Sequence, residues 1–255
     1  MKKPSVINWR VFWILFGASI IGAIAVIPFQ FTLQGILLSE VPLEGIIFSI
    51  IINAILFFVI IFLGLFLSKK IDFGAPILER LTEKKEVTSY LKSILGISIG
   101  LGILAGILMI IGDYLLYHFG GSTINLTTIT IPVWQGFLGA FYGGVNEEIL
   151  MRLLFMSLLI WIFFKIKKTD AGKPTLLSIW VAIIIAAIFF GLGHLVITSD
   201  ITAITPAIIT RAILLNGIGG IIFGWLYWKK GLESAMISHF SADIIIYVIF
   251  PLIPL

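Results

Sequence analysis

Seven long apolar runs limit what this chain can fold into more than any other feature of its sequence. They cover residues 11–33, 45–67, 93–117, 132–164, 175–196, 206–228 and 232–250, and each is bounded by charged residues, prolines or polar clusters. A helix needs roughly 20 apolar residues to cross a bilayer, whereas the strands of a membrane barrel would show about ten residues of alternating polarity. We therefore predict an all-α fold, a polytopic membrane bundle of about seven transmembrane helices, forming one domain over residues 1–255.

The composition agrees with a membrane protein and excludes several other classes. Hydrophobic residues make up 60% of the chain and charged residues 12%, well below the ~25% usual in soluble domains. Because the mean hydropathy is +1.15, the net charge of +4 does not indicate binding to nucleic acid. The chain has no cysteine, which excludes disulfides, thiol nucleophiles and zinc–thiolate sites.

The basic residues fall almost entirely in alternate loops. Of the 17 lysines and arginines, 15 lie around residues 2–10, 69–92, 165–173 and 229–230, and the intervening loops hold none. By the positive-inside rule these basic loops face the cytoplasm. We predict a multi-pass protein of the cell membrane, with a cytoplasmic N-terminus and an external C-terminus. The first apolar run continues beyond its small residues, so we expect a retained span and not a cleaved signal peptide.

The loop over residues 68–92 alternates charged and apolar residues. This pattern is typical of a solvated, loosely helical segment on the membrane surface. We therefore expect a solvated cytoplasmic loop and not a dedicated docking site.

Only two basic residues lie inside apolar runs, Arg152 and Arg211. A charge in a membrane span needs an internal partner or a function. Asp113 and Arg211 both lie near the outer ends of their spans, and we expect them to form a structural ion pair.

The fourth run contains two adjacent carboxylates, Glu147 and Glu148, followed by Arg152. On an α-helix Glu148 and Arg152 are four residues apart and about 40° apart around the axis, so they can pair. Glu147 points about 100° away from Glu148 and is left without that partner. It is therefore a candidate general base, although a buried ion-pair cluster that only fixes helix packing explains this motif equally well.

Two of the three histidines lie on spans and have a partner one helical turn away. Phe190 precedes His194 by four residues, and His239 precedes Asp243 by four. An aromatic ring can wall off an imidazole, and a carboxylate can fix its tautomer. A glutamate with two histidines is also a reasonable zinc set, so these residue types leave both a metal-free site and a zinc site open.

The depths of these residues in their spans do not match. At ~1.5 Å per residue, Glu147 is about 27 Å from Lys165 and His194 about 30 Å from Pro174, but His239 is only about 14 Å from Lys230. We therefore expect the fourth and fifth helices to tilt or to project into the cytoplasm around residues 165–173, which puts the pocket in the cytoplasmic half.

Taken in order, Glu147-Glu148-x-x-x-Arg152, Phe190-x-x-x-His194 and His239-x-x-x-Asp243 resemble the signature of the CAAX-protease and bacteriocin-processing family (CPBP, or Abi). That family includes the type II CAAX prenyl endopeptidases. The resemblance covers residues 132–250, the CPBP-like catalytic core, while the first three spans match only in being hydrophobic. It implies an intramembrane endopeptidase that hydrolyses a peptide bond of a membrane-associated substrate, prenylated or not.

The resemblance also implies roles for individual residues. Glu147 would activate water, His194 would help to hold that water, and Glu148 and Arg152 would order the site, with no cofactor. Phe190 would line the substrate pocket.

His239 and Asp243 would face the developing oxyanion. The best-studied branch of the family has asparagine where this chain has Asp243. An ionised aspartate cannot donate a hydrogen bond to an oxyanion, so Asp243 is either protonated or orients His239 as the donor.

Two functions of other classes also fit the sequence. Family members are associated with bacteriocin self-immunity and with scaffolding of membrane signalling proteins, for which a folded bundle suffices. A small transporter could use Glu147, Glu148 and the histidines as a proton relay, although no inverted repeat is present.

Overall fold

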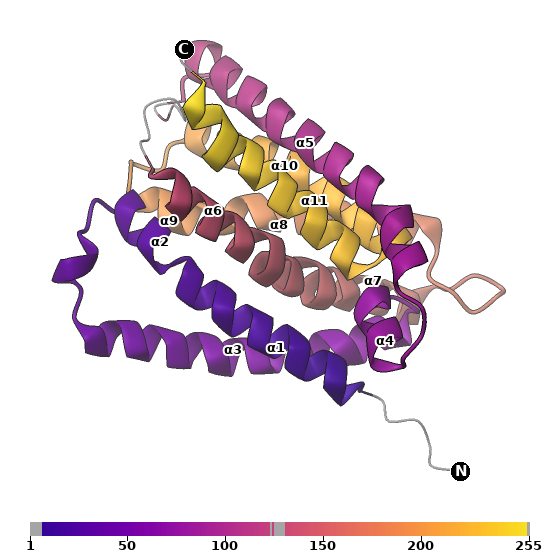
Figure 1. Cartoon of the computed structure of the whole chain (residues 1–255). Helices are drawn as coiled ribbons and strands as arrows, with labels where there is room; N and C mark the ends of the chain where they lie inside the picture. Colours follow the sequence, from indigo (N-terminus) through magenta and orange to yellow (C-terminus); the bar gives the residue numbers. More distant parts are fainter. Residues whose placement is uncertain (1–6, 123, 125–130, 254–255) are drawn as a thin grey trace.

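The computed structural model describes residues 7–122, 124 and 131–253. In these residues it has seven helical segments long and apolar enough to cross a membrane. They are Trp9–Leu33, Leu43–Lys70, Thr88–Phe119, Val133–Ile166, Leu176–Ser199, Pro206–Lys230 and Leu232–Leu252. The predicted all-α membrane bundle is confirmed, and every predicted run coincides with one of these segments to within a few residues at its ends (Figure 1).

Three of the spans are single α-helices for most of their length, and the other four are broken. The continuous ones are α3 (Leu43–Lys70), α5 (Thr88–Phe119) and α10 (Pro206–Lys230). The first span divides at Val26 into α1 (Trp9–Ala25) and α2 (Ile27–Leu33), where Pro28 cannot donate a backbone hydrogen bond. The fifth divides at His194 into α8 (Leu176–Gly193) and α9 (Leu195–Ser199).

The fourth and seventh spans contain π-helix, in which the backbone is wound more widely. The fourth consists of α6 (Val133–Tyr142), the π-helices η3 (Gly143–Glu147) and η4 (Ile149–Met156), and α7 (Ser157–Ile166). The seventh consists of α11 (Leu232–Ile244), the π-helix η5 (Ile245–Ile249) and the short 3₁₀ turn η6 (Phe250–Leu252). Because π-helical turns are rare and often occur at functional sites, the backbone alone makes both spans candidates for such a site.

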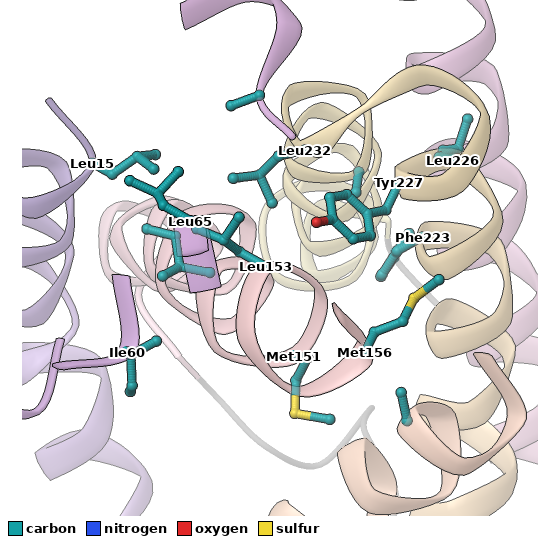
Figure 2. Close-up of a cluster of buried hydrophobic side chains, with 14 of the residues drawn as sticks. Leu15, Ile60, Leu65, Met151, Leu153, Met156, Phe223, Leu226, Tyr227 and Leu232 are labelled. Atoms are coloured by element: carbon teal, nitrogen blue, oxygen red, sulfur yellow. The ribbon is translucent and has the colours of Figure 1, made fainter. Parts of the chain in front are cut away.

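The fourth span lies inside the bundle. It packs against α1 and α3 on one side and against α8, α10 and α11 on the other, while α5 covers α10 and α11 (Figure 1). Figure 2 shows Leu153 of η4 beside Leu65 of α3. It also shows Met156 of η4 beside Phe223 of α10. Buried apolar side chains on both sides of η4 therefore fix the span that carries the predicted carboxylates.

Large apolar side chains also cover the outside of the bundle. On α3, for example, Phe48 is 66% exposed and Ile55 61% exposed. Soluble proteins rarely expose an apolar surface of this extent to water, whereas lipid chains can cover it. The exposed residues thus agree with a multi-pass membrane protein in a lipid environment.

Glycines bring α5 close to α11. A Cβ atom on Gly106 would come within 2.8 Å of the carbonyl oxygen of Ala242, so only glycine allows this approach. A hydroxyl contact between Ser98 and Ser234, at 2.7 Å, joins the same two helices. These contacts lie along the part of α11 that carries His239, so α5 supports this part of the seventh span.

The segment predicted to be a loosely helical surface loop contains a short helix, and part of it packs against the bundle. It forms the short helix α4 (Pro76–Thr82) across the end of the bundle, and Ile71 and Ala75 are buried. The backbone N–H of Leu78 donates to Glu233 Oε1 at 2.8 Å. The N–H of Leu232 donates to the carbonyl of Gly74 at 3.0 Å. Its alternating apolar residues serve as a cap over the start of α11.

The basic segments gather at one end of the bundle. The start of α1, α4, the hairpin between α7 and α8, and the turn between α10 and α11 lie at this end, while η1 (Leu38–Glu40), α9 and η6 lie at the other (Figure 1). Lys2 and Lys3 fall outside the described residues. The arrangement agrees with the predicted alternation of loops, and the side of the membrane that each end faces stays a prediction.

The fourth and fifth spans extend beyond their neighbours at the basic end of the bundle (Figure 1), while the side of the membrane that this end faces and the depth of the pocket stay predictions. The rings of Phe190 and His239 lie 5.6 Å apart. Phe190 is about 21 Å along α8 from Leu176, whereas His239 is only about 10 Å along α11 from Leu232. The hairpin between α7 and α8 therefore extends beyond its neighbours, as Figure 1 shows.

Candidate active site

The predicted carboxylates lie in the wide π-helical part of the fourth span. Glu147 ends η3, and Glu148 stands between η3 and η4. Gly143 and Gly144 precede them, and a Cβ on Gly144 would come within 2.9 Å of Phe240 Cβ. The buried Asn146 Nδ2 donates to the carbonyl of Ser19 in α1 at 2.9 Å. The glycines thus admit α11 on one side, and Asn146 ties the segment to α1 on the other.

Glu148 and Arg152 form the ion pair that their spacing predicted. Arg152 Nε lies 3.2 Å from Glu148 Oε2, and both side chains are fully buried. Arg152 also donates from NH2 to the carbonyl of Gly220 in α10, at 3.4 Å. The pair joins the fourth span to the sixth and leaves Glu147 without an arginine partner, as expected.

His239 of α11 contacts three carboxylates. Its Nδ1 lies 2.8 Å from Glu148 Oε1, and its Nε2 lies 3.8 Å from Glu147 Oε2 and 3.6 Å from Asp243 Oδ2. An ionised carboxylate only accepts hydrogen bonds, so Nδ1 is the donor to Glu148. The predicted contact with Asp243 is present, but Glu148, from another span, is the group that fixes the imidazole.

The charges of this cluster do not balance. Glu147, Glu148 and Asp243 bring three negative charges when ionised, and Arg152 brings one positive charge. A proton on His239 offsets part of the excess, because the imidazole touches all three carboxylates. A cluster with more carboxylates than cations can take up and release a proton more readily than one carboxylate paired with one arginine.

Glu147 is the most accessible carboxylate of the cluster. Its side chain is 26% exposed, compared with 13% for Asp243 and none for Glu148. Of the three carboxylates, Glu147 is therefore the one that the protein covers least.

His194 lies at the break between α8 and α9. Its Nδ1 is 2.8 Å from the carbonyl oxygen of Phe190. A carbonyl oxygen can only accept, so Nδ1 carries a hydrogen and the neutral ring keeps a lone pair on Nε2. Within the described part of the chain no hydrogen bond or ion pair joins His194 to Glu147 or to His239. The structure brings His194 to the cluster only through Phe190.

Phe190 is buried beside both histidines. Its ring centroid is 4.8 Å from that of His194 and 5.6 Å from that of His239, and Arg152 Cζ lies 5.1 Å from it. Its ring thus contacts both imidazoles and the guanidinium.

The sixth span contributes residues that the sequence analysis missed. The ring of Phe223 lies parallel to His239, with centroids 4.6 Å apart and planes inclined by 18°. Arg152 Cζ lies 5.6 Å from the same ring, and Gly220 accepts its hydrogen bond. The glycines around Phe223 signal close helix packing in the sequence, but they do not say which helix is approached.

A cavity of about 130 Å³ lies beside His194. Its walls are mostly apolar and come from α5, α9, α10 and η5, and polar side chains are supplied by His194, Asn216 and Arg211. Tyr247, one turn beyond Asp243, also lines it. The cavity therefore adjoins the candidate site and leaves room for a bound group.

The predicted pair of Asp113 and Arg211 is confirmed. Arg211 Nε donates to Asp113 Oδ1 at 2.7 Å, and a second guanidinium nitrogen contacts the same oxygen. This pair joins α5 to α10, and Arg211 also lines the cavity beside His194.

The zinc alternative would require both histidines and a glutamate around one ion. Among the residues that the structure describes, no group of three or more His, Asp or Glu side chains is arranged to hold a metal.

The fold and the cluster together define a polytopic membrane protein with a buried site of carboxylates, histidine and arginine. Residues 129–245 match the family model described as type II CAAX prenyl endopeptidase Rce1-like. This match supports a CAAX-protease family, which is a family of proteases, as the three motifs predicted. Comparison with the curated proteins and with the solved structures finds no match.

Proposed function

We propose that this protein is a membrane-embedded peptidase in which Glu147 activates a water molecule to hydrolyse a peptide bond. One observation carries the proposal: Glu147 is the most exposed carboxylate of a buried cluster in which Arg152 is already paired with Glu148. A carboxylate that is not paired with the arginine is suited to accept a proton from water. The protease family of residues 129–245 supports the same conclusion.

His194 would hold the attacking water together with Glu147. Its Nδ1 is committed to the Phe190 carbonyl, which leaves Nε2 as the acceptor in the neutral ring. A water between Nε2 and the Glu147 carboxylate would be oriented by two acceptors, with its oxygen lone pairs turned toward the substrate carbonyl.

His239 would stabilise the oxyanion. Its Nδ1 donates to Glu148, so a second proton on Nε2 makes the ring a donor on the side that Glu147 and Asp243 face. Asp243 then orients and charges His239, and it need not bind the oxyanion itself.

The substrate we propose is a membrane-associated peptide, and a prenylated peptide with a CAAX terminus is the first to test, on the basis of the family description. It would approach from the cytoplasm, the side assigned to the basic end of the bundle. We propose that the reaction needs no metal, since a base, a held water and an oxyanion donor are all supplied by side chains.

The test is cleavage of a quenched farnesylated CAAX peptide by the detergent-purified protein, with and without chelator. Beside the wild type we would measure Glu147→Gln and, as a matched control, Glu233→Gln, a buried glutamate that caps α4. Activity that survives chelation and the control substitution but is lost in Glu147→Gln supports the proposal. Loss with chelator would replace it with a metal mechanism, and equal cleavage by Glu147→Gln would refute it.

If a folded wild-type protein cleaves neither the farnesylated peptide nor its unprenylated counterpart, the proposed prenyl-peptide activity is wrong. The scaffold function, for which catalysis is not needed, then becomes the better account.

A further inference from the structure

The sixth span touches both cationic groups of the candidate site, although it carries none of the predicted motifs. Phe223 of α10 lies face to face with the imidazole of His239 and against the guanidinium of Arg152. Gly220, one turn earlier, accepts a hydrogen bond from that guanidinium.

Close helix packing fixes the position of Phe223. A Cβ on Gly220 would come within 2.7 Å of the Ala187 Cα, and one on Gly224 would come within 3.2 Å of Ile183 Cγ2. Both contacts press α10 against α8. Phe223 itself is only 1% exposed, so its ring has little freedom to turn away from His239.

Two constraints are needed to fix an imidazole, one on a ring atom and one on the ring plane. The hydrogen bond from Nδ1 to Glu148 is the first constraint, but alone it lets the ring rock about that bond. The parallel ring of Phe223 supplies the second, because an aromatic face attracts a flat cationic ring and resists its tilting. With both in place, Nε2 points at Glu147 and Asp243.

We propose that Phe223 is a positioning residue of the active site: it holds the plane of His239 so that Nε2 faces the reacting groups. The expected effect on kcat rests on the proposed peptidase function, whereas the effect on the ring plane of His239 does not. Phe223 acts through His239 and touches neither water nor substrate in this account.

The experiment compares Phe223→Leu, which keeps apolar bulk but removes the ring, with Phe223→Tyr, which keeps the ring. The matched control is Phe12→Leu. Phe12 is equally buried, and its ring packs against Trp9, Trp13, Phe16 and Phe58. Each variant is purified in detergent, and its melting temperature, kcat and KM for the farnesylated peptide are measured.

We expect Phe223→Leu to lower kcat by roughly 2- to 10-fold, with KM nearly unchanged. This factor corresponds to the free energy that a pair of aromatic rings contributes beyond its buried area. Phe223→Tyr should retain most of kcat, and Phe12→Leu should lower the melting temperature without a fall in kcat of the folded enzyme. If Phe223→Leu matches Phe12→Leu in kcat, Phe223 is only a packing residue.

A second readout does not depend on catalysis. The chain has three histidines, so ¹⁵N-histidine labelling gives few signals, and substitution of His118 and His194 assigns them. Ring current from the stacked Phe223 shifts the His239 carbon-bound protons upfield, and Phe223→Leu should remove that shift while Phe12→Leu leaves it in place. An unmoved His239 signal would overturn the proposal even in an active enzyme. An inactive wild type with the expected signal change would refute the peptidase alone.

Discussion

Two arginine–carboxylate pairs are buried in this bundle, and they differ in what surrounds them. Arg211 and Asp113 link α10 to α5 as one cation with one carboxylate. Arg152 and Glu148 lie on the same helix, and His239 connects them to two further carboxylates, Glu147 and Asp243.

The difference separates a structural charge from a functional one. A balanced pair in a membrane satisfies both partners and has no reason to exchange protons. The second cluster has more negative than positive charge and one partly exposed carboxylate, so protonation changes can occur there. The presence of a buried ion pair alone would not distinguish the two.

The largest effect should come from reversing one charge of the balanced pair. Asp113→Arg or Arg211→Asp alone leaves like charges facing each other, and breaking a buried pair costs about 3–5 kcal/mol. We expect either variant to be lost from the membrane fraction. The double variant Asp113→Arg with Arg211→Asp should restore expression, as measured by size-exclusion chromatography of a fluorescent fusion. If the double variant is no better than the single ones, the pair does not act as a unit.

Neutral substitutions should separate the two clusters by activity. Glu148→Gln removes the charge that fixes Arg152 and His239, so we expect roughly a hundredfold loss of peptide cleavage per folded molecule. Asp113→Asn should reduce the melting temperature but leave cleavage per folded molecule close to wild type. Equal losses of cleavage in both variants would mean that the comparison between structural and functional pairs is wrong.

A smaller effect should follow from moving α5 relative to the site. Gly106→Ala puts a Cβ against the carbonyl of Ala242 and should cost about 1–3 kcal/mol of stability through overpacking. Gly96, on the same helix, has open space at that position, so Gly96→Ala should be neutral or stabilising. Thermal unfolding followed by tryptophan fluorescence measures both. Similar melting temperatures for the two variants would show that α5 does not support α11 through this contact.

The smallest effect should come from an exposed pair. Lys85 Nζ lies 2.6 Å from Glu83 Oε2, and its hydrogen bond and charge lower the pKa of Glu83. A lowered pKa adds stability above the ordinary pKa of a glutamate and loses it as the pH falls further, but solvent screens a pair this exposed. Lys85→Ala should leave the melting temperature unchanged at pH 7 and at pH 4. A clear drop at pH 7 would place this pair among the stabilising contacts.

The sequence was sufficient to predict the spans and the pairs within one helix. Bilayer thickness sets the length of an apolar run, and a four-residue spacing places Glu148 beside Arg152 and His239 beside Asp243. The ion pair between Asp113 and Arg211 was also predictable, because few other partners exist at that depth.

Contacts between spans were not predictable in the same way. The bond between His239 and Glu148 joins residues 91 positions apart, and no spacing rule indicates which carboxylate an imidazole from another helix will meet. The role of Phe223 depends on α10 packing against α8, and the cap formed by α4 depends on Glu233. The π-helical winding around Glu147 likewise arises from tertiary packing, which an ideal α-helical wheel does not represent.

The most direct test of the account is cleavage of the farnesylated peptide by Glu147→Gln, measured per folded molecule together with its melting temperature. The substitution keeps the size of the side chain and removes its negative charge and its ability to take a proton. The account predicts a loss of kcat/KM of roughly 10²- to 10⁴-fold with a melting temperature close to that of the wild type. Cleavage at the wild-type rate by this variant would contradict the assignment of Glu147 as the base, and with it the proposed mechanism.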